Sequence, residues 1–347
     1  MNQQVGSGSL CFSKTPFIIS TGSVVGKKEG EGPLSACFDV IGTGDEKFGE
    51  ENWELAESAL QKEALTVTLS KINKQATDVR YLFAGDLLGQ TIASSFGLKE
   101  FEIPLFGLYG ACSTCGESLS LASMTIAAGY ADCVAAVTSS HFASAEKQFR
   151  FPLEYANQRP KSATWTVTGS GAFLLASQER LQEWKIPPLA RVTGITTGKI
   201  VDFGIKDSMN MGAAMAPGAC DLIYRHLQDF GRKPTDYDRI VTGDLGTIGS
   251  EILVDLLREK GYDIAEVHED CGVKIFDGAK QGTGAGGSGC GCSAVTLSGY
   301  YLSELQRGRM KRILFVPTGA LLSTVSFNEG QTVPGIAHGV VLEHVEE

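Results

Sequence analysis

Two pairs of closely spaced cysteines are the residues whose types and spacing could support chemistry. Cys112 and Cys115 open the stretch "ACSTCGESLSLASMTIAAGY", and Cys290 and Cys292 lie in "GGSGCGCSA" in the second part of the chain. A thiolate can be a nucleophile for acyl transfer or a metal ligand, whereas a buried thiol can simply fill space. Each of these three roles has its own sequence requirements.

The residues after Cys112 favour an anion-friendly position at the start of a helix. Thr114 and Glu117 have the spacing of a capping box, so the helix is predicted to begin at Thr114, with Cys112 just ahead of it. Backbone N–H groups and the positive end of the helix dipole would favour a thiolate or a bound anion there.

A metal or redox site is the second possible role of the four cysteines. Zinc sites favour two to four residues between paired cysteines, whereas Cys290 and Cys292 are separated by only one. Cys115 should project from within the helix, away from a shared centre. We therefore expect no metal ion and no cofactor, and we interpret Cys115 as helix packing.

Composition narrows the class of protein. The 347 residues include 40 acidic and 30 basic side chains without a clustered basic patch, which argues against nucleic-acid binding. No window approaches the roughly 18 apolar residues that span a bilayer, and the amino terminus lacks the pattern of a signal peptide. We expect a soluble chain made in the cytoplasm, whose nine cysteines are free thiols.

An internal duplication organises the elements that must position these residues. The stretch "ATDVRYLFAGDLLG" (residues 76–89) is echoed by "PTDYDRIVTGDLGT" (residues 234–247), and three further blocks match in the same order. Each half reads strand, helix, strand, helix, strand, strand. The pattern predicts two similar α/β halves, residues 1–180 and 181–347.

The helices of the two halves differ in polarity. Strands such as "YLFAG" and "ILFVP" are continuously apolar, which is typical of sheets covered on both faces. The amphipathic segment at residues 52–72 is predicted to cover an outer face. The cysteine-bearing segment at residues 114–129 has almost no charged side, so we expect it between the sheets, packed against its counterpart from the second half.

The duplicated α/β chain with a cysteine before a buried helix resembles the thiolase superfamily, and the likeness extends over nearly the whole chain. The resemblance implies a five-layered αβαβα fold, a homodimer, and Cys112 at the position of the nucleophile. Within the superfamily the chain is most similar to the stage V sporulation protein AD family, through "AGDLLGQ", "GACSTC", "TSSH", "EKQFRFP", "TVTGSGA", "GGSGCGCSA" and "PTGALLS".

The catalytic partners of the superfamily are missing from this sequence. Its enzymes place a histidine, and a second histidine or an asparagine, in two loops of the second half, where they activate the thiol and hold the oxyanion. Here either Gly243 or Asp244 of the first loop stands at that position, and the second loop, residues 284–292, contains only glycine, alanine, serine and cysteine. We therefore expect a binding protein and not an enzyme.

Few of the five histidines could replace the missing catalytic partners. We expect His226, on a helical stretch, and His268, among charges, at the surface. His141 and His338 are interpreted as hydrogen-bonding or ligand-orienting residues. The alternative is an acyl-transfer or condensing enzyme that uses Cys112 as nucleophile and His338 as an unusual base.

Resemblance to the sporulation family implies a specific ligand, dipicolinic acid, either free or with calcium. A flat ring needs apolar walls, and its two carboxylates need hydroxyls, backbone N–H groups or an arginine. Hydroxyls that end one strand or precede another, and the segment "AEKQFRFPLEY", offer such groups. The predicted ligand-binding residues are Cys112, Ser139, Ser140, His141, Phe149, Arg150, Thr166, Thr168 and His338.

The same resemblance implies partners. Because the sequence has no membrane-spanning segment, moving the ligand into the developing spore would depend on other stage V sporulation proteins in the membrane. We expect this chain to be a peripheral component at the spore inner membrane that presents dipicolinic acid to them.

Overall fold

The computed structural model describes residues 3–42, 44–149, 153–155 and 158–346. Its main feature is a 13-stranded sheet, ten of whose strands form one continuous order. In that order the strands are β12 (His268–Asp270), β11 (Arg239–Thr242), β14 (Arg312–Val316), β17 (Gly339–Glu343), β10 (Ala190–Thr196), β3 (Phe17–Val25), β9 (Gly169–Ala176), β7 (Cys133–Ser140), β5 (Tyr81–Gly85) and β6 (Leu105–Leu108).

The strand order repeats itself in mirror image about its centre. β5, β6 and β7 are parallel neighbours and β9 is antiparallel to them, and β11, β12, β14 and β17 repeat this arrangement in the second half. The two sets meet where β10 pairs with β3 at only two positions, Ala190 with Ile18 and Arg191 with Phe17. This symmetric order gives the sequence duplication a structural counterpart.

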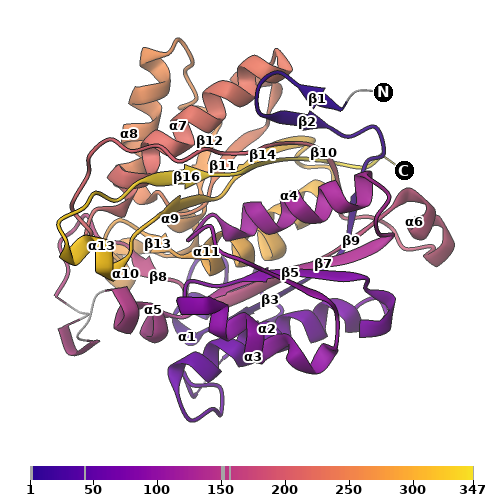
Figure 1. Cartoon of the computed structure of the whole chain (residues 1–347), viewed down its shortest axis with the longest axis horizontal. Helices are drawn as coiled ribbons and strands as arrows, with labels where there is room; N and C mark the ends of the chain where they lie inside the picture. Colours follow the sequence, from indigo (N-terminus) through magenta and orange to yellow (C-terminus); the bar gives the residue numbers. More distant parts are fainter. Residues whose placement is uncertain (1–2, 43, 150–152, 156–157, 347) are drawn as a thin grey trace.

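Five layers result from the way the helices pack. α4 (Thr114–Ala127) and α11 (Cys290–Thr296) lie between the two halves of the sheet (Figure 1). α2 (Trp53–Ser70) and α3 (Ile92–Leu98) cover one outer face, and α7 (Met211–Phe230) and α8 (Gly246–Glu259) cover the other. The predicted α/β class and αβαβα layering are confirmed.

The remaining elements are short. Strands β1, β2 and β4 pair at the margin of the main sheet, while β13 with β8 and β15 with β16 form two small ladders. Their bounds are β1 (Gln4–Val5), β2 (Ser9–Cys11), β4 (Val40–Ile41), β8 (Trp165–Thr166), β13 (Gly287–Ser288), β15 (Thr318–Ala320), β16 (Gly335–Ala337), α1 (Lys27–Gly30), α5 (Phe142–Phe149), α6 (Gln178–Trp184), α9 (Cys271–Ile275), α10 (Gly278–Gln281), α12 (Leu302–Gln306) and α13 (Thr324–Asn328). One π-helical turn, Leu297–Tyr301, joins α11 to α12.

The central helices approach the sheet very closely. Gly171 of β9 lies under α11, where an added Cβ would be 2.8 Å from the Cβ of Ala294. Such a distance is far inside van der Waals contact, so only glycine fits there. Glycine at this position fixes how deeply α11, and with it Cys290, enters the interior.

The start of α4 confirms one expectation and modifies another. The helix begins at Thr114 as predicted, but the Thr114 hydroxyl donates to the carbonyl of Ala111 at 2.6 Å. No side-chain cap forms at the residue before it, Ser113. Cys112 therefore occupies a tight turn closed by Ala111, whose φ is +50°.

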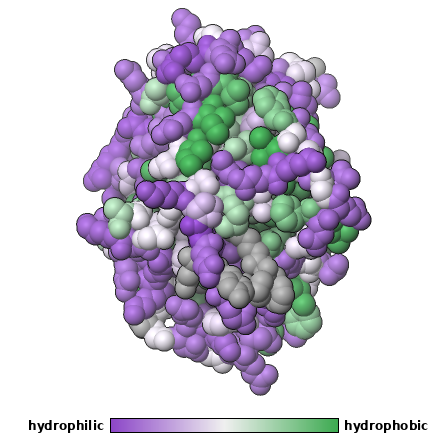
Figure 2. Space-filling model, turned by 90° about the vertical axis from the view of Figure 1, so that its left-hand side faces the viewer, coloured by the Kyte–Doolittle hydropathy of each residue, from purple (hydrophilic) through white to green (hydrophobic). Residues whose placement is uncertain are grey.

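The surface differs from the interior in the expected way. The side of the molecule that carries α5, α8 and α13 is largely hydrophilic, with separate patches of hydrophobic residues (Figure 2). Within the described part of the chain, no helix has both the length and the apolar character needed to cross a membrane.

Candidate functional site

A small cavity lies beside Cys112, between the two halves of the protein. Cys112 is 6% exposed and packs with Leu87, Ala145, Phe149 and Cys290. The cavity leaves about 30 Å³ open to water-sized molecules, which is enough for two or three of them. Its lining residues are Leu87, Tyr109, Ala111, Cys112, Ala145, Phe149, Thr166, Met211, Ser288, Ala320 and Leu322.

Asp244 is the polar partner of Cys112. Its carboxyl is buried, accepts a hydrogen bond of 2.7 Å from the Thr318 hydroxyl and one of 2.9 Å from the Gly289 N–H, and accepts a further one from the Cys112 thiol. Burial raises the pKa of Asp244 to about 7, although these hydrogen bonds oppose the shift. This carboxyl is therefore poised between its neutral and ionised forms near neutral pH.

The chemistry of this pair differs from that of a cysteine with imidazole. An imidazole can take the thiol proton and then stabilise the thiolate as a cation, whereas an ionised carboxylate repels a thiolate beside it. Asp244 follows β11 in the loop where the thiolase superfamily was expected to supply histidine or asparagine. The chain thus puts an acid where the nucleophile would need a base.

The second loop contributes backbone and thiol groups. Gly289 has a φ of +96° and directs its N–H at Asp244, and α11 starts at the next residue, Cys290. The Cys290 thiol donates to the carbonyl of Ser139 at 2.9 Å, and burial raises the pKa of Cys290 well above its ordinary value. Cys290 therefore acts as a neutral hydrogen-bond donor within the core.

Three of the nine predicted ligand-binding residues reach the cavity: Cys112, Phe149 and Thr166. Cys112 lies at the start of α4, Phe149 ends α5, and Thr166 ends the short strand β8. The Thr166 hydroxyl lies 3.3 Å from a carboxylate oxygen of Glu146. Arg150 lies outside the described residues.

Ser139 and Ser140 are buried but bonded elsewhere. Ser139 donates to Glu57 at 2.8 Å and accepts from Gln61 at 2.8 Å. Ser140 donates to the carbonyl of Val167 at 2.7 Å and accepts from a backbone N–H of α11 at 3.2 Å. Both hydroxyls hold elements together and neither lines the cavity.

Thr168 and His141 also serve the framework. The Thr168 hydroxyl accepts the first N–H of α5, from Phe142, at 3.1 Å. His141 Nε2 lies 2.9 Å from the carbonyl of Glu46, and its Nδ1 accepts the N–H of Ala143. The structure thus separates these two side chains from the cavity wall.

His338 lies close to α4 but does not line the cavity. Its Nδ1 accepts the N–H of Gly198 at 3.4 Å, and its carbonyl lies 2.9 Å from the Cβ position of Gly116. Burial lowers the pKa of His338 to about 4, so its ring is neutral at physiological pH. Among the described residues, no histidine lines this cavity.

The expectation that His226 and His268 lie at the surface is wrong. His226 is fully buried, with Nδ1 2.6 Å from the Thr196 hydroxyl and Nε2 2.5 Å from that of Tyr237. His268 is partly buried, and its Nε2 lies 2.9 Å from the Thr242 hydroxyl. The local sequence around a residue does not show which residues of other elements will pack against it.

Several cavity residues were not predicted. Tyr109 and Ser288 stand next to the two cysteine motifs, so proximity to those motifs could have identified them. Met211 and Leu322 come from segments without any chemical signature. They reach the cavity only because α7 and the segment after β15 fold over it.

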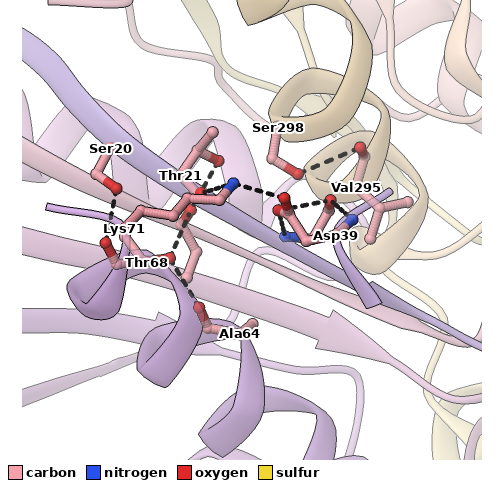
Figure 3. Close-up of polar contacts among 10 residues, drawn as sticks. Ser20, Thr21, Asp39, Ala64, Thr68, Lys71, Val295 and Ser298 are labelled. Carbon is pink, nitrogen blue, oxygen red and sulfur yellow. Dashed lines mark hydrogen bonds and ion pairs between the residues drawn. The ribbon is translucent and has the colours of Figure 1, made fainter. Parts of the chain in front are cut away.

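A larger groove of about 610 Å³ lies away from this cavity, and several of its polar groups already have hydrogen-bond or ion-pair partners (Figure 3). Lys71 donates to the carbonyl of Thr21 at 2.7 Å and pairs with Asp39 at 2.6 Å. Ser20 and Ser298 donate to backbone carbonyls at 2.6 Å and 3.2 Å. The smaller cavity beside Cys112 is therefore the better candidate site.

The part of the chain that the structure describes contains no group of three or more histidine, cysteine, aspartate or glutamate side chains arranged to hold a metal ion. Cys115 is fully buried inside α4 and its pKa is raised to about 12 by burial. Hydrogen bonds link its thiol with Thr138 and Ser293, so it packs α4 against β7 and α11.

Comparison with known proteins gives the chain a family and a fold. The family model described as stage V sporulation protein AD matches residues 6–343. Stage V sporulation protein AD of Bacillus subtilis strain 168 is 42% identical over 339 residues, which cover 97% of each chain.

Two solved structures, a synthase and a thiolase, share this architecture. The 3-oxoacyl-[acyl-carrier-protein] synthase III of Aquifex aeolicus VF5 matches with a TM-score of 0.55 and 13% identity, over 94% of this chain and 99% of its own. Human mitochondrial 3-ketoacyl-CoA thiolase matches with a TM-score of 0.58 and 14% identity, over 96% and 99%. At this identity the likeness establishes the fold alone.

Proposed function

The chain belongs to the stage V sporulation protein AD family, and from that premise we propose that it is a non-catalytic binding protein for dipicolinic acid. In this role it supports uptake of dipicolinate into the developing spore and its release in germination. The site proposed is the cavity beside Cys112.

One observation carries the non-catalytic part of the proposal. The side chain that hydrogen-bonds to Cys112 is the carboxyl of Asp244, and no histidine of the described chain lines the cavity. Losing even one oxyanion donor costs an enzyme about 3 to 4 kcal/mol of transition-state stabilisation. A site without the base and its oxyanion partner keeps a binding surface but not the means for Claisen chemistry.

The cavity has the composition that a flat aromatic dicarboxylate needs. Leu87, Phe149, Met211 and Leu322 supply apolar walls for a ring. Ser288 supplies a hydroxyl for a carboxylate oxygen. The hydroxyls of Thr166 and Tyr109 donate to Glu146 and to the carbonyl of Leu87 at 3.3 Å each, so they must turn from these partners to donate to the ligand. The starts of α4 and α11 lie beside it, and their backbone dipoles favour anions.

The cavity must enlarge to accept the ligand. Sites for drug-sized ligands have volumes of roughly 300 Å³ or more, against about 30 Å³ here. Phe149, at the end of α5, is only partly buried, so its ring can move aside. Binding should therefore be accompanied by a change in the environment of Phe149.

Titration calorimetry with dipicolinate tests this function, with and without calcium. We expect saturable binding that weakens when Thr166 is replaced by valine, because the hydroxyl is lost while the shape is kept. Benzene-1,3-dicarboxylate and pyridine-2-carboxylate are matched ligands that lack the ring nitrogen or one carboxylate. Neither heat nor thermal stabilisation at millimolar dipicolinate would contradict the proposal.

The position of Cys112 at the start of α4 supports one competing function, acyl transfer with Cys112 as nucleophile and His338 as base. That function requires a covalent acyl group on the sulfur. Incubation with acyl-CoA followed by mass spectrometry of the peptide containing Cys112 distinguishes the two, since the binding function predicts no added mass.

The surface of the first half supports a homodimer as part of the proposal. β6 ends the described order of the sheet, and Leu105 and Phe106 are 42% and 51% exposed along it. Phe96 of the neighbouring α3 is 50% exposed. An unpaired strand edge with apolar side chains invites pairing with a second copy. Other stage V sporulation membrane proteins remain proposed partners, at which this chain would act as a peripheral ligand-loading component.

A further inference from the structure

We propose that Asp244 couples ligand binding to the uptake of one proton, so that the cavity accepts a dicarboxylate only when the Asp244 carboxyl is neutral. The inference rests on the proposed function and concerns the same cavity. It assigns a positioning and selectivity role to a residue that does not itself line the cavity but hydrogen-bonds to Cys112, which does.

The duplication provides an internal comparison for Asp244. In the first half its counterpart is Asp86, at the end of β5 in the matching Gly-Asp-Leu motif. Asp86 accepts the N–H of Leu88 at 2.8 Å and both the N–H and hydroxyl of Ser94, at 2.8 and 2.7 Å. All these donors lie within eight residues, so Asp86 caps its own loop.

In the second half a different acid, Asp270, caps the corresponding loop. Asp270, at the end of β12, accepts the N–H groups of Leu245 and Gly246 at 2.9 and 3.1 Å, as well as the hydroxyl of Thr242 at 2.7 Å. Asp244 is thereby released from its loop. Its carboxyl turns instead to groups 45 and 74 residues away, Gly289 and Thr318, and to Cys112.

The titratable groups that face Asp244 are acids and thiols. Cys112 precedes α4, Asp270 ends β12, Cys271 starts α9, and Cys292 lies in α11. Burial raises the pKa of Cys271 and of Cys292 well above the ordinary value, so both stay neutral. Among these described neighbours there is no cation to offset a second negative charge.

A dianion entering the cavity therefore meets an acid with a pKa of about 7 on the far side of the Cys112 sulfur. Like charges across a buried site disfavour each other, so the ligand raises the pKa of Asp244 further and binding takes up a proton. Affinity should then fall as pH rises through 7, approaching a tenfold loss for each further pH unit. The ligand itself, as a carboxylic acid with ordinary pKa values, stays ionised over this range.

Calorimetry with dipicolinate at pH 8, in two buffers of different ionisation enthalpy, measures the proton directly. We expect close to one proton taken up for each ligand bound. Asp244→Asn keeps an oxygen for the Gly289 N–H and an amide to donate to the Thr318 hydroxyl. In this variant uptake should vanish and binding at pH 8 should be about tenfold tighter than in the unmodified protein.

Thr318→Val gives a second, independent readout. The Thr318 hydroxyl donates to Asp244 and so stabilises its ionised form. Without it the pKa of Asp244 rises, and the fall in affinity should move to higher pH. A merely structural role would weaken binding equally at every pH, and that result would overturn the inference.

Glu29→Gln is the matched control. The pKa of Glu29 is also raised to about 7 by burial, and its carboxylate accepts the N–H of Thr168 at 3.0 Å. Proton uptake should persist in this variant. Binding without proton uptake in the unmodified protein overturns the role of Asp244 alone, whereas absence of binding from pH 6 to 8 overturns the proposed function.

Discussion

Ser139 donates a hydrogen bond of 2.8 Å to Glu57, and both side chains are fully buried beneath the first half of the sheet. Ser144 donates to the other carboxylate oxygen at 2.7 Å. Burial, reinforced by the nearby Asp86, raises the pKa of Glu57 to about 8. The serine predicted to touch a ligand thus solvates an acid of the framework.

Buried acids should make the protein less stable as pH rises above 6.5. The pKa values of Glu29, Glu57, Asp244 and Asp270 are raised to about 7, 8, 7 and 6, so in the folded state these acids hold protons that the unfolded chain has released. Their stabilisation is complete below the unfolded pKa of about 4 and is lost as pH rises through 6 to 8. Melting temperatures should fall from pH 6.5 to about 8 and level off above it, where both states are ionised.

Because of the buried histidines, the predicted fall in stability with pH applies only above pH 6.5. The pKa of His226 is lowered to about 3 and those of His268 and His338 to about 4, all by burial. Their effect opposes that of the acids between pH 4 and 6.5 and disappears above it. Glu57→Gln should flatten the upper slope, while Glu63→Gln, an equal change at an exposed position of α2, should not. A melting temperature that stays level up to pH 8 would contradict the prediction.

Replacing His226 should lower the free energy of unfolding without affecting dipicolinate binding. Its ring is fully buried between Thr196 and Tyr237, so His226→Ala leaves a cavity and removes two buried hydrogen bonds, at a cost of about 3 kcal/mol. Tyr237→Phe should cost about 1 to 2 kcal/mol, because it leaves His226 Nε2 without its partner. Urea unfolding measures both, and unchanged stability in both variants would be the contrary result.

A charge on the outer edge of the sheet should separate the proposed dimer. Leu105→Glu places a carboxylate on β6, where two copies would bring like charges together. Ile200→Glu is the control, since Ile200 is 62% exposed in the second half. Sedimentation should show monomers for the first variant and dimers for the second. Equal masses for the two variants would rule out β6 as the interface.

Cys112→Ala should weaken dipicolinate binding only a few-fold. The sulfur fills one wall of the cavity and donates to Asp244, but in the binding function it forms no bond to the ligand. Calorimetry together with a melting curve checks the result. Complete loss of binding in a variant that melts normally would point to a covalent role for the sulfur.

Repetition and polarity in the sequence predicted the two α/β halves and the enclosed helix, whereas the five-layered arrangement was implied by the resemblance to the thiolase superfamily. The echo of residues 76–89 in residues 234–247 becomes β5 and β11 at matching places in the sheet. The segment after Cys112, in which Glu117 is the one charged residue, becomes the buried α4. Periodic apolar residues report burial directly, so these features needed no knowledge of distant contacts.

The site was less predictable because hydroxyl and imidazole groups have many possible partners. The sequence offers side chains that could bind a ligand in Ser140, Thr168 and His141. In the structure each of them is already hydrogen-bonded to a backbone group of a nearby element. Asp244 was visible in its loop, but its contact with Cys112 depends on Asp270 replacing it as the loop cap, 26 residues later. Only the three-dimensional structure shows which of the two acids caps the loop and which contacts Cys112.

The two halves of the sheet are joined only by the short pairing of β10 with β3, and both halves contribute residues to the cavity. Leu87, Cys112 and Phe149 come from one half, whereas Met211, Ser288 and Leu322 come from the other. Neither half lines the cavity by itself, so either half expressed alone would lack part of the cavity wall. A substitution that tilts one half against the other will reshape the chamber even when every lining residue is unchanged.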